Sequence, residues 1–464
     1  MSGQVAAHEI VERTLALSST HGCVVIVRTE GVANLRWARS TLTTNGETVR
    51  RSVTVIAVAE VPGGIASGSV TVDSPTVDDL PGVLRRAETM AEEDGAADDA
   101  AALATGIDAS PDWSEGAERV TAAGLARVAD EIGAVLEGGR GDGIEHFGYL
   151  EQTITTIHLG TSSGVRLRYA DHDARFEGTA KSHERTRSSW VGSGGSTLDA
   201  LDLPAIDAEL RRALAWQERR IDLAPGRHAA VLTPSATADL MIELYWSSVG
   251  REAADGQSVW SRSGGGTRVG ESVVDPRVTL DSDPALPGFE CLPFVVARGS
   301  SASSSVFDNG LPADAARWIS EGVLESLITT RRTASETGLP HRPEVDNLRL
   351  SVAGSSGTLD DLVARTGDGV LVNCLWYNRV VDPQTLLLTG LTRDGVYVVR
   401  GGEVVGAASN FRFNDSPVDV LRRIDDAGAP VAALGREMAD YFHRASMPPL
   451  LVRDFNFSTV SQAF

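Results

Sequence analysis

Two His-Glu pairs in this sequence have the residue types that a hydrolytic zinc site requires. Such a site places two histidines about one helical turn apart, so that both imidazoles face one metal, with a glutamate between them to activate water. The positions where the second histidine would follow hold other residues: Arg187 and Ser188 after His183-Glu184, and Glu12 and Arg13 after His8-Glu9. We therefore interpret both pairs as solvated polar residues.

The remaining histidines could meet only through the fold. His172 and His183 could face each other across adjacent strands if Asp171-His172-Asp173 turns the chain back, although nothing in their spacing requires it. An unfamiliar metal site built from His158, His172, His183 or His228 is retained as an alternative hypothesis, which metal analysis of the purified chain would test.

Serine-nucleophile and phosphate-loop motifs each have their own sequence requirements. A serine elbow needs G-x-S-x-G after a strand, and we identify no such pentapeptide with a plausible strand before it. The glycine-rich pieces Gly192–Gly195 and Gly264–Gly266 lack the Lys-Ser/Thr ending of a phosphate loop, so we interpret them as flexible turns. The paired carboxylates Asp360-Asp361 and Asp425-Asp426 are typical of an acidic surface and carry no catalytic assignment.

The cysteine content and the charge limit the class of protein. Cys23, Cys291 and Cys374 are odd in number and widely spaced, which argues against a disulfide framework and predicts a reducing, cytoplasmic compartment. Cys291, beside Leu292-Pro293-Phe294, is predicted to be a small core residue. With 63 acidic against 42 basic residues and a formal net charge of −21, direct binding to nucleic acid is disfavoured. No apolar run reaches the length of a membrane span.

The elements that must position any site predict an α+β, multi-domain chain of 464 residues. Residues 1–110 are predicted to form an N-terminal α/β domain that ends in an acidic, Ala- and Gly-rich linker, residues 111–224 a central domain, and residues 225–464 a large β-rich C-terminal domain. Apolar spacings of three and four, or alternation, predict the following elements. Helices are expected around residues 7–15, 84–90, 125–135, 207–219 and 236–249, and another from Ser416-Pro417, where Ser416 is expected to cap the first turn. Strands are expected near residues 24–27, 34–39, 53–59, 149–159, 165–169 and 174–181.

The C-terminal third contains an ordered set of motifs. Phe307-Asp308-Asn309-Gly310-Leu311-Pro312 is followed by Trp318–Glu325 and by Arg332-Thr333-Ala334. Further motifs then follow in order: Trp376, Val381–Thr385, Thr389-Gly390, Asp394-Gly395, Gly401–Val404 and Asn410-Phe411. Together they resemble the signature of the TldD/PmbA family, also called modulator of DNA gyrase. Thr161–Gly164 resembles the family's N-S-x-G segment in a weakened form.

The resemblance implies a protease of two subunits. The TldD branch carries H-E-x-x-x-H on a helix that opens the C-terminal domain, and a cysteine near the C-terminus completes its metal site. The PmbA or TldE branch lacks that motif and pairs with the first. Here the corresponding helix, Pro234–Tyr245, contains no histidine, and Met447–Phe464 contains no cysteine. We therefore assign no catalytic, cofactor-binding or metal residue, and expect zinc only on a TldD-type partner.

Three interpretations follow. The first is a non-catalytic PmbA/TldE-type subunit that assembles with a TldD-type metalloprotease acting on unstructured peptides. The second is a stand-alone homodimeric binding protein with a regulatory role, and the third is the unfamiliar histidine site described above. Glu243, on the same helix, is interpreted as a solvated or capping residue rather than a surviving base. Phe455-Asn456-Phe457 is expected to form a terminal strand with both rings on one face.

Overall fold

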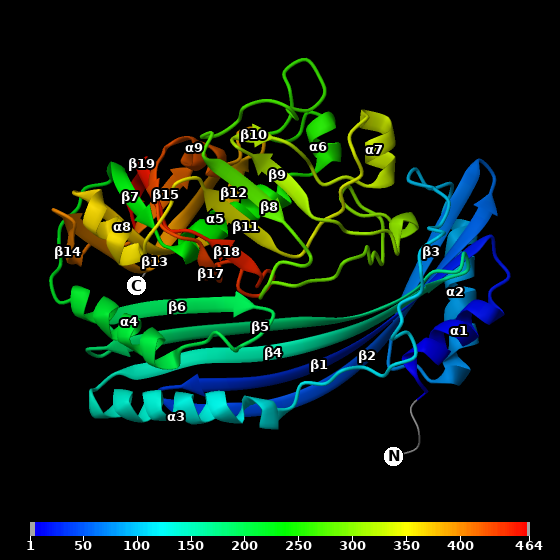
Figure 1. The fold of residues 1–464 in the computed structure, drawn as a ribbon, viewed down its shortest axis with the longest axis horizontal. Helices are drawn as coiled ribbons and strands as arrows, with labels where there is room; N and C mark the ends of the chain where they lie inside the picture. Colours follow the sequence, from blue (N-terminus) through cyan, green and yellow to red (C-terminus); the bar gives the residue numbers. More distant parts are fainter. Residues whose placement is uncertain (1–4, 462–464) are drawn as a thin grey trace.

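The structure, a computed structural model, describes residues 5–461. One long antiparallel sheet fills the first part of the chain, in the strand order β3-β2-β1-β4-β5-β6 (Figure 1). Its strands are β1 (Gly22–Ala38), β2 (Thr41–Val61), β3 (Gly64–Asp73), β4 (Glu145–Thr161), β5 (Arg166–Ser182) and β6 (Arg187–Gly195). Because β1 pairs with both β2 and β4, the sheet continues across the predicted boundary at residue 110. The division into three domains stays a prediction.

The two faces of this long sheet are covered differently. The β-branched run of β1 alternates, so that Val25 and Val27 join one core and Val24 and Ile26 join another. Helices cover the first face: α1 (Ala7–Leu17), α2 (Leu80–Glu93), α3 (Ala126–Gly141) and α4 (Leu203–Trp216). The second face packs against the C-terminal part of the chain through Phe294 and Phe307. The molecule therefore has three layers, with the long sheet in the middle (Figure 1).

The C-terminal part contains two further sheets. One has the order β10-β9-β8-β11-β18-β17, and in the other the path β12-β7-β19-β15-β13-β14 is closed by pairing of β12 with β13, with β16 beside β19. The strands are β7 (Gly226–Leu232), β8 (Val278–Ser282), β9 (Ala316–Ser320), β10 (Val323–Leu324), β11 (Leu348–Val352), β12 (Gly369–Asp382), β13 (Leu387–Arg400), β14 (Glu403–Ala407), β15 (Phe411–Asp415), β16 (Ile424–Ala427), β17 (Val431–Ala433), β18 (Ala445–Met447) and β19 (Leu450–Val460). The helices are α5 (Pro234–Trp246), α6 (Gly250–Ala254), α7 (Arg331–Thr337), α8 (Leu359–Thr366) and α9 (Pro417–Arg422).

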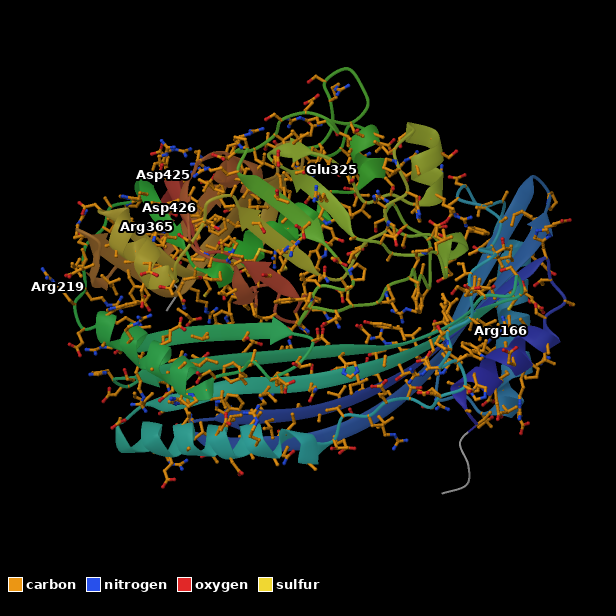
Figure 2. The ribbon with its side chains drawn as sticks, viewed as in Figure 1. Arg166, Arg219, Glu325, Arg365, Asp425 and Asp426 are labelled. Carbon is orange, nitrogen blue, oxygen red and sulfur yellow. The ribbon has the colours of Figure 1, made fainter. Side chains whose placement is uncertain are left out.

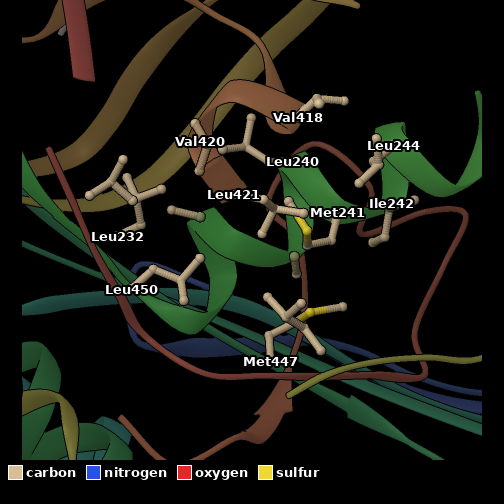
Figure 3. Packing of buried hydrophobic residues seen from close by; sticks show 14 of the residues in the cluster. Leu232, Leu240, Met241, Ile242, Leu244, Val418, Val420, Leu421, Met447 and Leu450 are labelled. Atoms are coloured by element: carbon tan, nitrogen blue, oxygen red, sulfur yellow. The ribbon is translucent and has the colours of Figure 1, made fainter. Parts of the chain in front are cut away.

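Helix α5 lies between these two sheets and is almost completely buried. Leu240, Met241 and Leu244 pack with Leu421 and Met447 in the largest hydrophobic core (Figure 3). Thr233 caps the helix by accepting a hydrogen bond from the Ala236 N–H at 3.2 Å, and Pro234 occupies the first turn. A helix enclosed in this way is hydrophobic on nearly all sides, which explains its weak amphipathic pattern.

The fold class and most predicted elements are confirmed. Val53, Val55, Ala57 and Ala59 lie together in one core, as their alternation predicts. Phe455 and Phe457 lie on β19, fully buried, with their ring centroids 5.1 Å apart. None of the helices among residues 5–461 is both long and apolar enough to cross a membrane.

Several local predictions are wrong. The strands predicted near 24–27 and 34–39 belong to one strand, β1. The strands predicted at 165–169 and 174–181 belong to one strand, β5, so Asp171-His172-Asp173 does not turn the chain back. Gly192–Gly195 belongs to β6 rather than to a flexible turn. Ser416 precedes α9, but its hydroxyl donates to the Thr385 carbonyl at 2.8 Å and does not cap the helix.

Candidate functional site

Helix α5 is the place where the family resemblance positions metal ligands, and Asp239 is its central polar residue. The Asp239 side chain is completely buried. Its carboxylate accepts hydrogen bonds from the backbone N–H groups of Arg436 at 3.0 Å, Glu437 at 2.9 Å and Met438 at 3.4 Å. Burial raises the Asp239 pKa well above its ordinary value, although the three N–H groups oppose this. Asp239 therefore anchors a chain segment and is not presented to a ligand.

Glu243 lies one turn further along α5. Burial raises its pKa, and the neighbouring Glu437 adds to this, while Arg379 lowers it. Glu437 is itself engaged, because its carboxylate accepts from the Tyr377 N–H at 2.8 Å and from Arg379 at 2.9 Å. The local donor set is therefore two carboxylates and one guanidinium, with no imidazole.

This donor set does not fit a catalytic zinc ion, which takes three protein ligands drawn from imidazole, thiolate and carboxylate. Asp239 is committed to backbone N–H groups, and Arg379 places a positive charge beside the two remaining carboxylates. Among residues 5–461, no group of three or more His, Cys, Asp or Glu side chains is arranged to hold a metal.

The three cysteines are free and buried. Burial raises the pKa of Cys23 to about 11 and that of Cys291 to about 12, and it raises the Cys374 pKa well above its ordinary value. These groups are therefore thiols at neutral pH, whereas the thiolate is the metal ligand and nucleophile. The prediction that Cys291 belongs to the core is confirmed.

The structure does not bring together the histidines of the alternative metal site. His158 is buried and bonded to the Glu115 carbonyl at 3.2 Å, and burial lowers its pKa to about 4. His172 contacts Glu118 at 3.1 Å, and His228 contacts the Ala224 carbonyl at 2.9 Å. His183 opens the turn after β5, eleven residues from His172 along extended chain, which separates them by about 35 Å.

Neither of the two His-Glu pairs belongs to a metal site in the structure. His183-Glu184 occupies the turn between β5 and β6, with φ of 50° and 55°, so it is not helical. His8-Glu9 lies on α1, where Glu9 pairs with Arg13 at 3.2 Å.

One serine motif was missed. Gly160–Gly164 does read G-x-S-x-G, and its first two residues end β4, which contradicts the prediction that no such pentapeptide has a plausible strand before it. It leads into β5 rather than into a helix, and the Ser162 hydroxyl accepts a hydrogen bond from the Cys23 N–H at 2.9 Å. The strand-to-helix turn of a nucleophile elbow is therefore absent at this motif.

The paired carboxylates form surface ion pairs. Asp360 contacts Arg212 at 2.5 Å, and Asp361 caps α8. Asp426 contacts Arg365 at 2.7 Å on the outer side of the C-terminal part (Figure 2). These contacts are those of surface residues and do not form a catalytic pair.

Sequence reasoning missed a ladder of charged contacts between β5 and the segment Arg436–Arg444, which we call the β5 ladder. Alternate residues of β5 point to the C-terminal part and meet that segment in order. The pairs are Glu177 with Arg436 at 2.7 Å, Arg175 with Asp440 at 2.6 Å, Asp173 with His443 at 2.5 Å and Asp171 with Arg444 at 2.8 Å. The signal in the sequence was the period of two in the charges at 171, 173, 175 and 177.

The contacts of His443 favour its imidazolium form. One ring nitrogen faces the Asp173 carboxylate and the other lies 2.9 Å from the Ala439 carbonyl oxygen, so both nitrogens face acceptors. Burial lowers the His443 pKa, but the hydrogen bond and charge of Asp173 outweigh it, so the net pKa is raised. Burial raises the Asp173 pKa, and the contacts with His443 and Arg444 outweigh it, so that pKa is lowered.

Comparison with known proteins identifies the class. A family model described as the PmbA/TldA metallopeptidase C-terminal domain matches residues 225–459, about half of the chain. This match defines a metallopeptidase-related protein. The chain belongs to the PmbA/TldD family.

Solved structures of low identity share the fold over nearly the whole chain. TldE from Thermococcus kodakarensis is similar with a TM-score of 0.77 at 12% identity, covering 97% of this chain and 99% of that one. A protein named as a modulator of a DNA gyrase from Thermotoga maritima gives 0.75 at 14% identity, with 97% and 99% covered. A protein with a corresponding name from Bacteroides thetaiotaomicron gives 0.74 at 13% identity, with 98% of each chain covered. At these identities the likeness shows the fold alone.

One curated relative matches a shorter stretch. A metalloprotease from Archaeoglobus fulgidus is 29% identical over 150 residues, which is 32% of this chain and 28% of that protein. The match therefore spans less than a third of the relative's length.

Proposed function

We propose that this chain is a non-catalytic, metal-free subunit of a TldD/TldE-type heteromeric metalloprotease that acts on unstructured peptides. Zinc then belongs to a TldD-type partner, and this chain helps to enclose or select the substrate. The free cysteines support a reducing, cytoplasmic location.

The observation that carries the proposal is the chemistry of α5. This helix opens the matched domain, where the family's metal-carrying branch has H-E-x-x-x-H, and here its buried acid binds three backbone N–H groups. A general base needs a polarised water beside it, and Glu243 faces Glu437 and Arg379 instead.

A second candidate is a stand-alone homodimeric protein with a binding or regulatory role. The net charge of −21 favours a basic protein surface as its target rather than nucleic acid. This candidate differs from the first in that the chain would not associate with a TldD-type chain.

The experiment purifies this chain alone, with its TldD-type neighbour, and as the neighbour alone. Zinc content, light scattering and cleavage of an unstructured peptide are measured for each. We expect the lone chain to contain no stoichiometric zinc and to leave the peptide intact, and the pair to co-elute and cleave. Stoichiometric zinc and cleavage by the lone chain would exclude the subunit proposal, and failure to co-elute would favour the second candidate.

Two variants sharpen the test. Glu243→Gln in this chain should leave cleavage by the pair unchanged, because the proposal gives Glu243 no chemical role. The corresponding Glu→Gln change within the partner's H-E-x-x-x-H should abolish cleavage. If Glu243→Gln abolishes cleavage while the pair still co-elutes, this chain contributes to catalysis and the proposal is wrong.

A further inference from the structure

The outer side of β2 lacks a neighbouring strand over half of its length. On its inner side β2 pairs with β1 from Thr41 to Val58. On its outer side β3 pairs only from Ser52 to Val61, and beyond this, within residues 5–461, no strand pairs with the outer side of Thr41–Arg50. We call Thr41–Arg50 the β2 edge. It lies at the margin of the long sheet opposite β6 (Figure 1).

The direction of the backbone groups on this edge follows from one hydrogen bond. In an antiparallel strand the N–H and C=O of one residue point to the same side, and neighbours alternate. The Arg51 carbonyl accepts from the Ser74 N–H at 2.7 Å, on the outer side. The register with β1 is unbroken from Thr44 onward, so Asn45 and Val49 also direct their N–H and C=O outward.

The edge has few of the features that prevent strand addition. It contains no proline, and its bulge with β1 lies at the hairpin end, near Trp37. All of its residues are exposed except Gly46, which is partly buried, and the exposed side chains include Leu42 and Val49, 46% and 47% exposed. Threonine and valine favour strands, and natural proteins block such edges with proline, bulges or charge.

The sequence of the edge also fits a copy of itself. If two copies pair antiparallel with Gly46 opposite Gly46, each copy's Thr44 lies opposite the other copy's Thr48. The glycine at the centre of the pair leaves room for close approach. In this register no charged side chain lies opposite a like charge, since Arg50 meets Leu42. A register centred one residue later would set Glu47 against its own copy.

We propose that the β2 edge pairs antiparallel with the β2 edge of a second copy of this chain, across a two-fold axis at Gly46. The two long sheets then form one continuous sheet, and the interface is isologous. The proposal does not rest on the proposed function.

A disulfide between the copies tests the register. Thr44 and Thr48 point their backbone groups inward, so across the two-fold axis they form a non-hydrogen-bonded pair with Cα atoms about 4.5 Å apart, which suits a disulfide. The lone chain carrying Thr44→Cys and Thr48→Cys should form a covalent dimer of twice 49.0 kDa under mild oxidation. Thr44→Cys alone, which faces Thr48 of the copy, is the matched control and should stay uncross-linked. The native cysteines are buried.

A second measurement tests the edge without new cysteines. Val49→Pro removes an outward N–H and leaves the ladder with β1 intact, so the dimer dissociation constant from light scattering should rise at least about tenfold, the effect of 1.4 kcal/mol. Circular dichroism checks that the variant is folded. A wild-type monomer at all concentrations, cross-linking by Thr44→Cys alone to the same extent, or a folded Val49→Pro dimer of unchanged affinity would each overturn the proposal.

Discussion

At the scale of single residues, the contacts of Asp239 indicate whether α5 has a catalytic or a structural role. An acid on the helix where the family resemblance implies metal ligands suggests a catalytic role. Its three backbone N–H partners show instead that it fixes the segment Gly435–Met438, whose approach is so close that a Cβ at Gly435 would lie 2.6 Å from Asp239 Oδ1. The acid is structural.

Asp239→Ala should therefore destabilise the protein strongly. The substitution leaves buried N–H groups without an acceptor, and each such group costs about 1–3 kcal/mol. We expect a loss of at least about 3 kcal/mol in the free energy of unfolding, measured by urea denaturation. Glu243→Gln is the control on the same helix and should change the free energy by less than about 1 kcal/mol. Equal effects of the two variants would contradict the anchoring role.

His443 should make stability depend on pH. Its pKa is raised in the folded state, so its contribution is fully present below the unfolded value of about 6.5 and is lost as pH rises through the folded pKa. Asp173, whose pKa is lowered, contributes above its unfolded value and loses this as pH falls through the folded pKa. The pair is therefore strongest in mildly acidic solution.

We expect His443→Gln to flatten the fall in melting temperature on the alkaline side of pH 6.5, as measured by calorimetry in buffers of equal ionic strength. His183→Gln, in the β5–β6 turn, is the control and should follow the wild type. A pH profile of His443→Gln that matches the wild type above pH 6.5 would rule out this role.

How much of the site could be predicted differs from residue to residue. The lack of histidine on Pro234–Tyr245 follows from the sequence alone, because the identity of a possible metal ligand is a property of the sequence. The partners of Asp239 and Asp173 were not, because they lie at residues 436–438 and 443, and only the fold brings such distant positions together. The motif at Gly160–Gly164 is also a property of the sequence, whereas its lack of a following helix is a property of the fold.

At the scale of elements, periodicity predicted the amphipathic helices and the half-buried strands because one face of each is apolar. Periodicity failed to predict a strand where glycine residues allow another segment to pack closely against it. Gly192 and Gly194 read as a turn, yet they lie in β6, where the segment Leu434–Arg444 approaches the strand. Glycine within a strand often marks such a close approach.

Gly194→Ala tests this explanation. An added Cβ would lie 2.2 Å from the His443 carbonyl oxygen, which is backbone and cannot move away as a flexible side chain would. We expect a loss of about 1–3 kcal/mol, read from the urea midpoint. Gly133→Ala on α3 is the matched control, since nothing lies within 4 Å of its added Cβ, and it should stabilise the helix by about 0.5–1 kcal/mol. A neutral Gly194→Ala would show that β6 and the segment can separate.

At the scale of the whole molecule, the long sheet and the C-terminal part share their cores. Val24 and Leu159 from the sheet pack with Phe294 and Phe307 from the second half of the chain. The β5 ladder adds charge pairs between the two parts, in which Arg444 is only 1% exposed. Removing either half would uncover apolar side chains and leave buried charges without partners, which is costly.

The chain should therefore unfold in one cooperative transition despite its length. Thermal melts followed by far-ultraviolet circular dichroism and by tryptophan fluorescence should coincide, because Trp37 lies in the core of the sheet and Trp318 in the core of the C-terminal part. The fragment 225–464, expressed alone, should bind a hydrophobic dye that the full chain does not, since Phe294 and Phe307 lose their cover. Two separated transitions, or a fragment that stays folded and does not bind the dye, would instead support independent domains of the kind that composition alone predicts.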